Sequence, residues 1–443
     1  VLASSGTEAV QCVGHARKEE NGQLRMAPAS RPLIVNLRIT AGLLLVALAL
    51  SSCSALSTAT PVMLYVAMVI GKDDRISSDT QKDARQRVDL IVSNFQKLYP
   101  NVQVQLALYR RSMLMAELRS RSEADLGPDL VLTDAQQAKA LLREGLTDPL
   151  PQTERSSKQT DPGILKHVRL QDGRLAGQPL VLYPQIACFN TQAIAAPPQT
   201  LNELLQVGAA GARVGLSVAM NEVLWTAGSL NALPALAAAA RNQSLSADQR
   251  DRITGWLTWL QQASNQRNLT FFENQGQLTT LLGNRELDWI SCTSDMLFRL
   301  KDRLGDDLGI APLPSGPNGS AAPMNLLRVL ALGKDSSAHQ RSIAIALSDY
   351  VTNPLLQRNL SLLSTSFVPV NPDVMIATKS SKNLAALELA LKDSQIQGDN
   401  LTAIEGDGPT TETMTNLLIP LVFGVSQPQT TTDELISILS QES

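Results

Sequence analysis

The chain has few residues whose types and spacing could support catalysis or metal binding. Its three histidines, His15, His167 and His339, are isolated from one another in the sequence. None belongs to an H-E-x-x-H zinc motif, and no G-x-S-x-G nucleophile motif or phosphate-binding G-x-x-x-x-G-K-[ST] loop occurs. His167 and His339 lie in hydrophilic stretches, so we expect both side chains to be solvated at the surface.

Paired carboxylates could act as a general acid and base without any local signature. The candidates are Asp306 with Asp307 and Glu405 with Asp407. Acidic residues in loops are usually solvated, and we interpret both pairs in that way. The sequence therefore predicts a protein that is not an enzyme and that uses no cofactor or metal ion.

An apolar run near the start of the chain has the layout of an export signal. The run 39–50 follows two arginines and precedes two serines. It is too short to span a bilayer, which takes about 20 apolar residues, but it suits a secretory signal. Its end, Leu50-Ser51-Ser52-Cys53, resembles a bacterial lipobox, in which the cysteine is acylated. We expect a signal over 26–53, lipid on Cys53, a tether over 54–61 and a non-native upstream extension over 1–25. The protein would then be periplasmic or at the cell surface, anchored to the membrane by lipid.

Two of the four cysteines remain for the folded part of the chain. Cys12 precedes the signal, and Cys53 is the expected lipid-attachment residue. Cys188 and Cys292 have no metal-type spacing and no histidine nearby. They could form a disulfide in an extracytoplasmic compartment, or they could be two buried free thiols, which is the alternative we prefer.

Composition excludes one class of partner. Lysine and arginine number 38 against 41 acidic residues, a formal charge of −3. Nucleic-acid-binding domains normally carry a basic excess, so no nucleic-acid partner is expected. The hydrophobic share of 44% is that of a globular protein, and the length suits two or three domains.

Strands and helices alternate from residue 62 onward. The apolar run 62–70 is typical of a strand buried on both faces, and 102–109 alternates as a strand does. Asp134 could cap a helix over 135–143 that Gly145 would end. This alternation predicts a parallel sheet covered on both faces. The expected elements are strands 62–70, 102–109 and 130–132 and helices 79–98, 112–122 and 135–143.

The alternation recurs after Gly177 and predicts a second unit of sheet and helices. Residues 179–190 suit an extended crossing segment, and Thr200 could cap the next helix. Trp256 and Trp259 are interpreted as core residues of one helix. The expected elements are strands 213–218, 287–292, 308–311 and 325–332 and helical regions 223–241, 247–265 and 337–352. Because ligands bind at the carboxyl ends of strands in such sheets, the loops expected near a cleft are 71–74, 133–136, 183–185 and 293–295.

Four stretches, in this order, resemble segments of one protein family. They are "GPDLVLTDAQQAKALLREGLTDPLP", "GRLAGQPLVLYPQIACFNTQAIAAPPQTLNELL", "GNRELDWISCTSDMLFRLKDRLGDDLGIAPLPSGPNG" and "RVLALGKDSSAHQRSIAIALSDYVTNPLLQRNLSLLSTSFVPVNPDV". Behind a lipobox, they resemble the family-1 extracellular solute-binding proteins, the maltose-binding-like receptors of ABC transporters. The likeness covers nearly all of 62–443.

The resemblance implies an α/β, two-lobe fold of the type II periplasmic-binding-protein kind. Each lobe would be a mostly parallel sheet flanked by helices. Lobe 1 would comprise 62–182 and 326–374, and lobe 2 would comprise 183–325 and 375–443. The hinges would lie near 182–185, 325–328 and 374–378.

The same resemblance, carried over residue by residue, gives a set of ligand-binding candidates. They are Asp134, Gln136, Tyr183, Trp225, Thr293, Ser294, Asp295, Phe367 and Met414. Thr293 to Asp295 replace a Gly-Pro-aromatic turn that often stacks on sugar in the family, and Met414 stands where a stacking aromatic occurs. A small polar sugar or polyol is therefore expected rather than a long maltodextrin.

The resemblance implies a monomeric receptor that delivers its solute to an ABC transporter permease by cleft closure, without catalysis. Three alternatives remain open. The same fold could bind a polyamine, a metal chelate or a phosphate ester. The chain could be an anchored enzyme acting on polysaccharide, or a sensor or structural lipoprotein with a degenerate cleft.

Overall fold

The computed structural model describes residues 61–70, 76, 78–405 and 408–441. The expected signal, Cys53, the upstream extension and nearly all of the tether lie outside these residues, as do the loop 71–74 and Asp407. The described residues fall within one compact unit that runs from Thr60 to Ser443.

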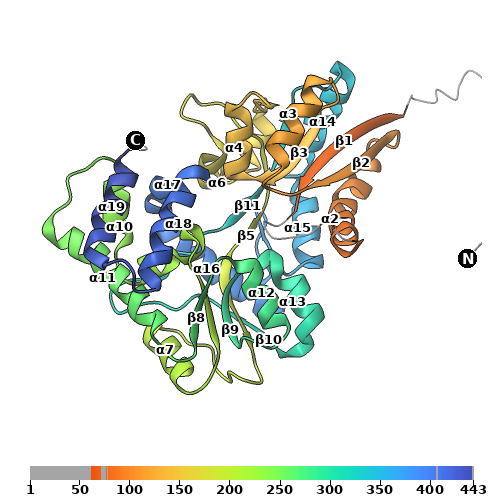
Figure 1. Ribbon diagram of the computed structural model, residues 1–443. Coiled ribbons are helices and arrows are strands. Elements are labelled where there is room, and N and C mark those ends of the chain that lie inside the picture. Colours follow the sequence, from red (N-terminus) through yellow and green to blue (C-terminus); the bar gives the residue numbers. More distant parts are fainter. Residues whose placement is uncertain (1–60, 71–75, 77, 406–407, 442–443) are drawn as a thin grey trace, which may run out of the picture. The chain divides into compact units, whose positions relative to one another are not determined.

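The first sheet contains seven described strands, of which Figure 1 labels β1, β2, β3, β5 and β11. Its order is β12-β5-β11-β3-β1-β2, with β4 pairing on β11. Its strands are β1 (Val62–Val69), β2 (Val102–Tyr109), β3 (Leu130–Asp134), β4 (Thr147–Asp148), β5 (Gln178–Tyr183), β11 (Leu326–Gly333) and β12 (Val368–Pro369).

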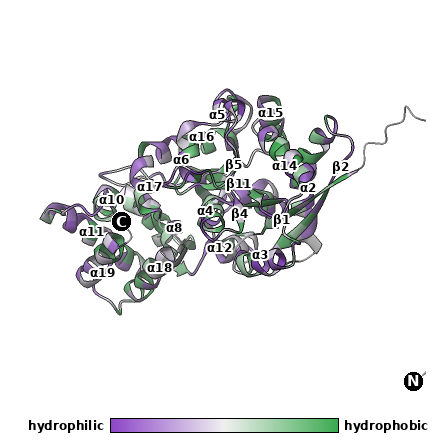
Figure 2. Cartoon of the chain, turned by 90° about the horizontal axis from the view of Figure 1, so that it is seen from above, coloured by the Kyte–Doolittle hydropathy of each residue, from purple (hydrophilic) through white to green (hydrophobic). Residues whose placement is uncertain are grey.

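The expected parallel arrangement is confirmed for the first three strands. β1 is almost entirely hydrophobic, as Figure 2 shows, and it pairs in parallel with both β2 and β3. The later strands differ, because β11 runs antiparallel to both β3 and β5. The sheet is therefore mixed rather than mostly parallel. The physical reason is that β11 begins beside the end of β5, since Leu326 pairs with Tyr183, and therefore runs back in the opposite direction.

The second sheet contains five described strands in the order β10-β6-β9-β7-β8. β7 runs parallel to β8 and β9, whereas β6 is antiparallel to β9 and β10, so this sheet is mixed as well. Its strands are β6 (Gln185–Asn190), β7 (Val214–Ser217), β8 (Leu269–Phe272), β9 (Trp289–Thr293) and β10 (Leu308–Ala311).

A disulfide joins β6 to β9. Cys188 and Cys292 lie on these two strands, two residues apart in register, with their Cα atoms 6.0 Å apart. Both residues are fully buried. The preferred expectation of two free thiols is wrong, because antiparallel pairing across 104 residues of sequence brings the two sulfurs together.

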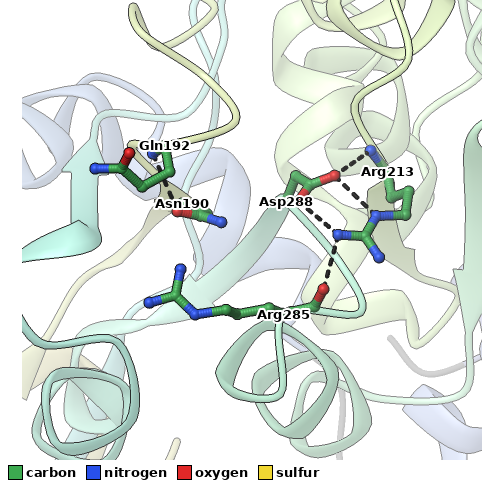
Figure 3. Close-up of polar contacts among 5 residues, drawn as sticks. All are labelled: Asn190, Gln192, Arg213, Arg285 and Asp288. Carbon is green, nitrogen blue, oxygen red and sulfur yellow. Dashed lines mark hydrogen bonds and ion pairs between the residues drawn. The ribbon is translucent and has the colours of Figure 1, made fainter.

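An ion pair joins Arg213 and Asp288, the residues that directly precede β7 and β9, as Figure 3 shows. The Arg213 guanidinium donates to both carboxylate oxygens of Asp288, at 2.9 and 2.8 Å, and also to the carbonyl oxygen of Arg285. The Arg213 backbone N–H donates to the same carboxylate. Burial alone would raise the pKa of Asp288, but these hydrogen bonds outweigh it and hold that pKa below its usual value.

Helices cover the sheets, and several begin at the caps expected from sequence. Asp134 accepts a hydrogen bond from the Gln137 N–H, and Thr200 from that of Glu203. Gly145 follows its helix at φ +65°, a conformation that glycine adopts without strain. The helices of the first half are α2 (Ser78–Gln96), α3 (Leu114–Glu123), α4 (Ala135–Arg143), α5 (Glu154–Lys158), α6 (Pro162–Val168) and α7 (Leu201–Ala209).

The alanine-rich region 223–241 does not form one helix. It contains the end of one short helix and two more, with Asn231 at φ 56° and Pro234 near the last break. The remaining helices are α8 (Met220–Val223), α9 (Trp225–Ser229), α10 (Leu233–Ala240), α11 (Ala247–Ser264), α12 (Gln275–Gly283), α13 (Leu297–Leu304), α14 (Ala338–Tyr350), α15 (Pro354–Leu363), α16 (Lys382–Ile396), α17 (Gly398–Ile404), α18 (Gly408–Val422) and α19 (Pro428–Gln441).

The C-terminal helices pack against α10 and α11, as Figure 1 shows. Their shared core contains Trp256, whose indole N–H donates to the Thr226 hydroxyl at 2.8 Å. Trp259 is partly buried against the same core. The interpretation of this tryptophan pair as core residues is confirmed.

The chain passes between the two sheets at defined points. β5 ends at Tyr183, and β6 begins two residues later, after Pro184. The chain returns between β10 and β11, at Leu326. The strands therefore divide at the expected crossing points, while the lobe boundaries themselves stay a prediction. Near the first crossing, the buried Gln185 donates to the Glu222 carbonyl and accepts from the Met324 N–H, which ties both crossings together.

Candidate functional site

A cavity of about 1450 Å³ is lined by residues from both sheets and from both crossings. This volume exceeds the roughly 300–1,000 Å³ of most small-molecule pockets. Its walls also include parts of α6, α12, α13, α16 and α17.

Four of the expected ligand-binding residues line this cavity: Asp134, Gln136, Thr293 and Asp295. They belong to the ends of β3 and β9 and to the residues that follow these strands. The Thr293 hydroxyl donates to the Asp295 carboxylate at 2.6 Å. The rule that polar residues after strands face a cleft therefore located these four side chains.

The other five expected residues do not line the cavity. Trp225 is fully buried against Trp289, with ring centroids 6.3 Å apart, and Met414 lies 1% exposed in the core of the C-terminal helices. Tyr183 and Phe367 pack edge to face. Ser294 is also fully buried. Large apolar side chains gain more by burial in these cores than by facing the cleft, which explains the positions of Trp225, Met414 and Phe367.

Two buried amides that the sequence reasoning missed line the cavity with unpaired atoms. Nε2 of Gln275, at the start of α12, and Oδ1 of Asn325, beside β11, have no hydrogen-bond partner among the residues that the structure describes. Gln275 follows β8, so the strand-end rule applied to that strand would have found it. Asn325 does not follow a strand directly. The one sequence signal for it is its position at the expected second crossing, just before β11.

Aromatic side chains other than those expected face the cavity. Phe272, at the end of β8, is partly buried in the lining, and Phe298 on α13 is exposed there. Both could present an apolar face to a ligand. Neither lies at a position that the family resemblance pointed to.

Two arginines and one carboxylate meet at the edge of the first sheet. Arg111 forms an ion pair with Asp134, whose carboxylate also caps α4. Arg328 lies directly opposite Asp134 in the register of β11 and β3, and all three residues line the cavity. Burial, and after it the positive charge of Arg328, lower the pKa of Arg111 to about 10. Asp134 therefore lies next to both arginines, to Arg111 through the ion pair and to Arg328 through the strand register.

His167 is not a solvated surface residue, contrary to expectation. It lies in the cavity lining on α6, and its Nδ1 is 3.1 Å from a carboxylate oxygen of Glu405, which follows α17. Its neighbours Asp161 and Lys166 line the same cavity. His339 is exposed, as expected. Asp306 and Asp307 form ion pairs with Lys301 and Arg285 at the surface.

The sequence model of one family matches residues 91–388, which is more than half of the chain. This family is described as bacterial extracellular solute-binding protein. The chain belongs to this family. The matching model is that of family 8, whereas the sequence resemblance pointed to family 1 of the same class. Solute-binding proteins of this kind are receptors and not catalysts. No curated protein matches the chain.

Solved structures confirm the solute-binding fold. The GacH receptor of Streptomyces glaucescens, solved without ligand and with acarbose, is 14% identical with a TM-score of 0.63, covering 86% of this chain and 100% of its own. A Thermotoga lettingae solute-binding protein bound to α-D-tagatose is 13% identical with a TM-score of 0.63 (86% and 99% covered). The maltotriose-bound MalE domain of Bdellovibrio bacteriovorus is 16% identical with a TM-score of 0.63 (86% and 99% covered).

The described part of this solute-binding protein lacks two features that other receptors can have. Its described residues contain no group of three or more His, Cys, Asp or Glu side chains that could hold a metal ion. None of the helices in the described ranges combines the length and the apolar character needed to cross a membrane.

Proposed function

We propose that this protein binds a small polyhydroxylated solute, a sugar or a sugar-like polyol, in the cavity lined by both sheets. The observation that carries the proposal is the pair of unpaired amide atoms, Gln275 Nε2 and Asn325 Oδ1, buried in the cavity lining. One is a donor and the other an acceptor. A hydroxyl group can satisfy either of them.

The energetics favour such a ligand. A buried polar group without a partner costs about 1–3 kcal/mol, and a ligand that supplies the partner removes this cost. The polar residues Asp134, Gln136, Thr293 and Asp295 are further candidates for contact with sugar hydroxyls. Phe272 and Phe298 offer apolar faces for the C–H surface of a ring. The structural neighbours named above were solved with acarbose, tagatose and maltotriose, which supports the assignment to carbohydrate.

The proposed mechanism is closure of the cleft around the solute. Residues that line the cavity come from both sheets, so a ligand held between them stabilises the form in which both contact it. The expected hinges are residues 182–185, 325–328 and 374–378. The first two coincide with the crossings that Gln185 ties together. The closed form would be recognised by an ABC transporter permease, which receives the solute unchanged.

The place of action follows from the leader expected in the sequence. A lipid on Cys53 would hold the protein at the membrane on the outer side, with residues 54–61 as a tether. The family is extracellular, which supports this location. A monomer with one cleft would suffice for delivery to the permease.

Calorimetric titration tests the proposed ligand class. The panel should include glucose, galactose, maltose, maltotriose, glycerol-linked sugars, their acidic analogues, spermidine and a metal–citrate complex. We expect at least one sugar to bind at a 1:1 ratio and to be recovered chemically unchanged. Binding of spermidine or the metal complex alone, or conversion of any sugar, would overturn the proposal.

A further inference from the structure

Resting on the proposed function, we propose that the solute carries an acidic group, a carboxylate or a phosphate ester, that binds between Arg111 and Arg328. The ligand class is then an acidic sugar rather than a neutral one. The inference follows from the balance of charge at the edge of the first sheet, where β3, β11 and the cavity meet.

Positive charge exceeds negative charge at this edge. Asp134 is the carboxylate of the group, and it is already engaged by Arg111 and by the Gln137 N–H at the start of α4. Arg328 is half-buried, and none of the residues that the structure describes forms a hydrogen bond or an ion pair with its side chain. A half-buried guanidinium without an acceptor is unfavourable, and a second one nearby makes it more so. An anionic group bound between them would relieve both costs.

Four other acidic residues in the lining are engaged by donors other than Arg328. Asp161 accepts from the Gly163 N–H at the start of α6, and Glu222 accepts from the Gln275 N–H. Asp295 accepts from Thr293, and Glu405 contacts His167. Asp302 and Asp399 also line the cavity, at exposed positions on α13 and α17, and neither forms a hydrogen bond or an ion pair with Arg328.

The position of Arg328 suits a ligand with both hydroxyl and acidic groups. Arg328 and Asn325 lie three residues apart at the start of β11, and both line the cavity. The unpaired Asn325 Oδ1 can accept from a hydroxyl while Arg328 and Arg111 bind the acid. Guanidinium groups bind carboxylate and phosphate oxygens with two parallel hydrogen bonds, which fixes the orientation of the ligand.

Matched neutral and acidic sugars test this inference. The purified protein should be titrated in a calorimeter with glucose against glucuronate, galactose against galacturonate, and glucose against glucose 6-phosphate. We expect one acidic member to bind at least tenfold more tightly than its neutral twin. Its affinity should fall as salt rises from 50 to 500 mM, because the contact is ionic, while that of the neutral twin should not. The two uronate pairs test for a carboxylate on the ligand, and the glucose 6-phosphate pair tests for a phosphate ester.

Variants of Arg328 assign the preference to this side chain. Arg328→Gln should reduce the affinity for the acidic sugar at least tenfold and leave that for its neutral twin within twofold, whereas Arg328→Lys should retain part of the preference. Arg358→Gln is the control, because it removes the same charge from an exposed site on α15. Without ligand, Arg328→Gln should keep or raise the melting temperature, since Arg328 forms no hydrogen bond or ion pair with the residues described. A lower melting temperature would mark a structural role and count against the proposal.

The outcomes distinguish this inference from the function on which it rests. If a neutral sugar binds as tightly as its acidic twin, the acidic-ligand inference is overturned and the proposed sugar receptor stands. If no sugar of either kind binds, the proposed function fails and the inference fails with it. If an acidic sugar binds equally well to Arg328→Gln, the assignment to Arg328 is wrong.

Discussion

Arg328 lies directly opposite Asp134 across β11 and β3, yet the Asp134 carboxylate is paired with Arg111. The carboxylate thus pairs with one of these two arginines and also caps α4. Arg328 is left without a carboxylate partner among the described residues of this solute-binding receptor. Unmet electrostatic and hydrogen-bonding capacity is what a binding site needs before its ligand arrives.

Replacing Gln275 by leucine should separate binding from stability. Its Nε2 has no partner in the described part of the chain, so Gln275→Leu should leave the melting temperature of the unliganded protein unchanged or higher. Affinity for the sugar identified by calorimetry should fall about tenfold, since one hydrogen bond is worth about 1–1.5 kcal/mol. Gln206→Leu, at an exposed position on α7, is the matched control and should change neither quantity by much. A destabilised Gln275→Leu variant with normal affinity would show that Gln275 has a structural role instead.

The disulfide should make a large contribution to stability. Cys188 and Cys292 close a loop with a sequence separation of 104, for which the chain-entropy model gives about 4–5 kcal/mol. The double variant Cys188→Ser, Cys292→Ser should therefore lower the free energy of unfolding by about 2–5 kcal/mol in urea titrations. Intact mass of the unreduced protein should be 2 Da below the value for two free thiols, by the loss of two hydrogens. A mass equal to that of the free thiols, or an unchanged urea midpoint, would contradict the bond.

Acid should weaken the contact between Arg213 and Asp288. The pKa of Asp288 is held below its unfolded value of about 3.9, so the contact contributes fully above about pH 4. The contribution is lost as the pH falls from there through the folded-state pKa. Asp288→Asn should cost about 1–2 kcal/mol at pH 7, the lower end for a charged hydrogen bond because half of the Arg213 side chain is exposed.

Chemical denaturation at several pH values measures this effect. The difference in unfolding free energy between the wild type and Asp288→Asn should shrink as the pH falls below 4. Asp251→Asn removes an exposed carboxylate on α11 and serves as the control, with a change near zero throughout. A difference that stays constant with pH would mean that the ion pair does not account for the cost.

The local parts of the fold could be predicted because their signals are local. Strand 102–109 and helix 135–143 have the predicted bounds, since alternation and an Asp cap with a closing glycine specify them within a few residues. The region 223–241 could not be predicted in the same way. Alanine favours helix throughout it, but Asn231 adopts positive φ where tertiary packing turns the chain. The direction of β11 likewise depends on a crossing between sheets that no local pattern records.

The candidate site was predictable only where it follows a strand. Asp134 and Thr293 end β3 and β9, and the strand-end rule located both. Arg328 lies inside β11, where a single arginine in an apolar strand gives no functional signal. Trp225 and Met414 were placed by family position, but their bulk favours the core, and core packing depends on contacts distant in sequence.

The most direct test of the account is small-angle X-ray scattering of the purified protein with and without a saturating sugar. The sugar should be the one that binds most tightly in the calorimetric panel. Closure of the cleft around it predicts a smaller radius of gyration, and the Gln275→Leu variant should need more sugar to reach the same value. An unchanged radius at full occupancy would contradict the claim that the two sheets close on the solute.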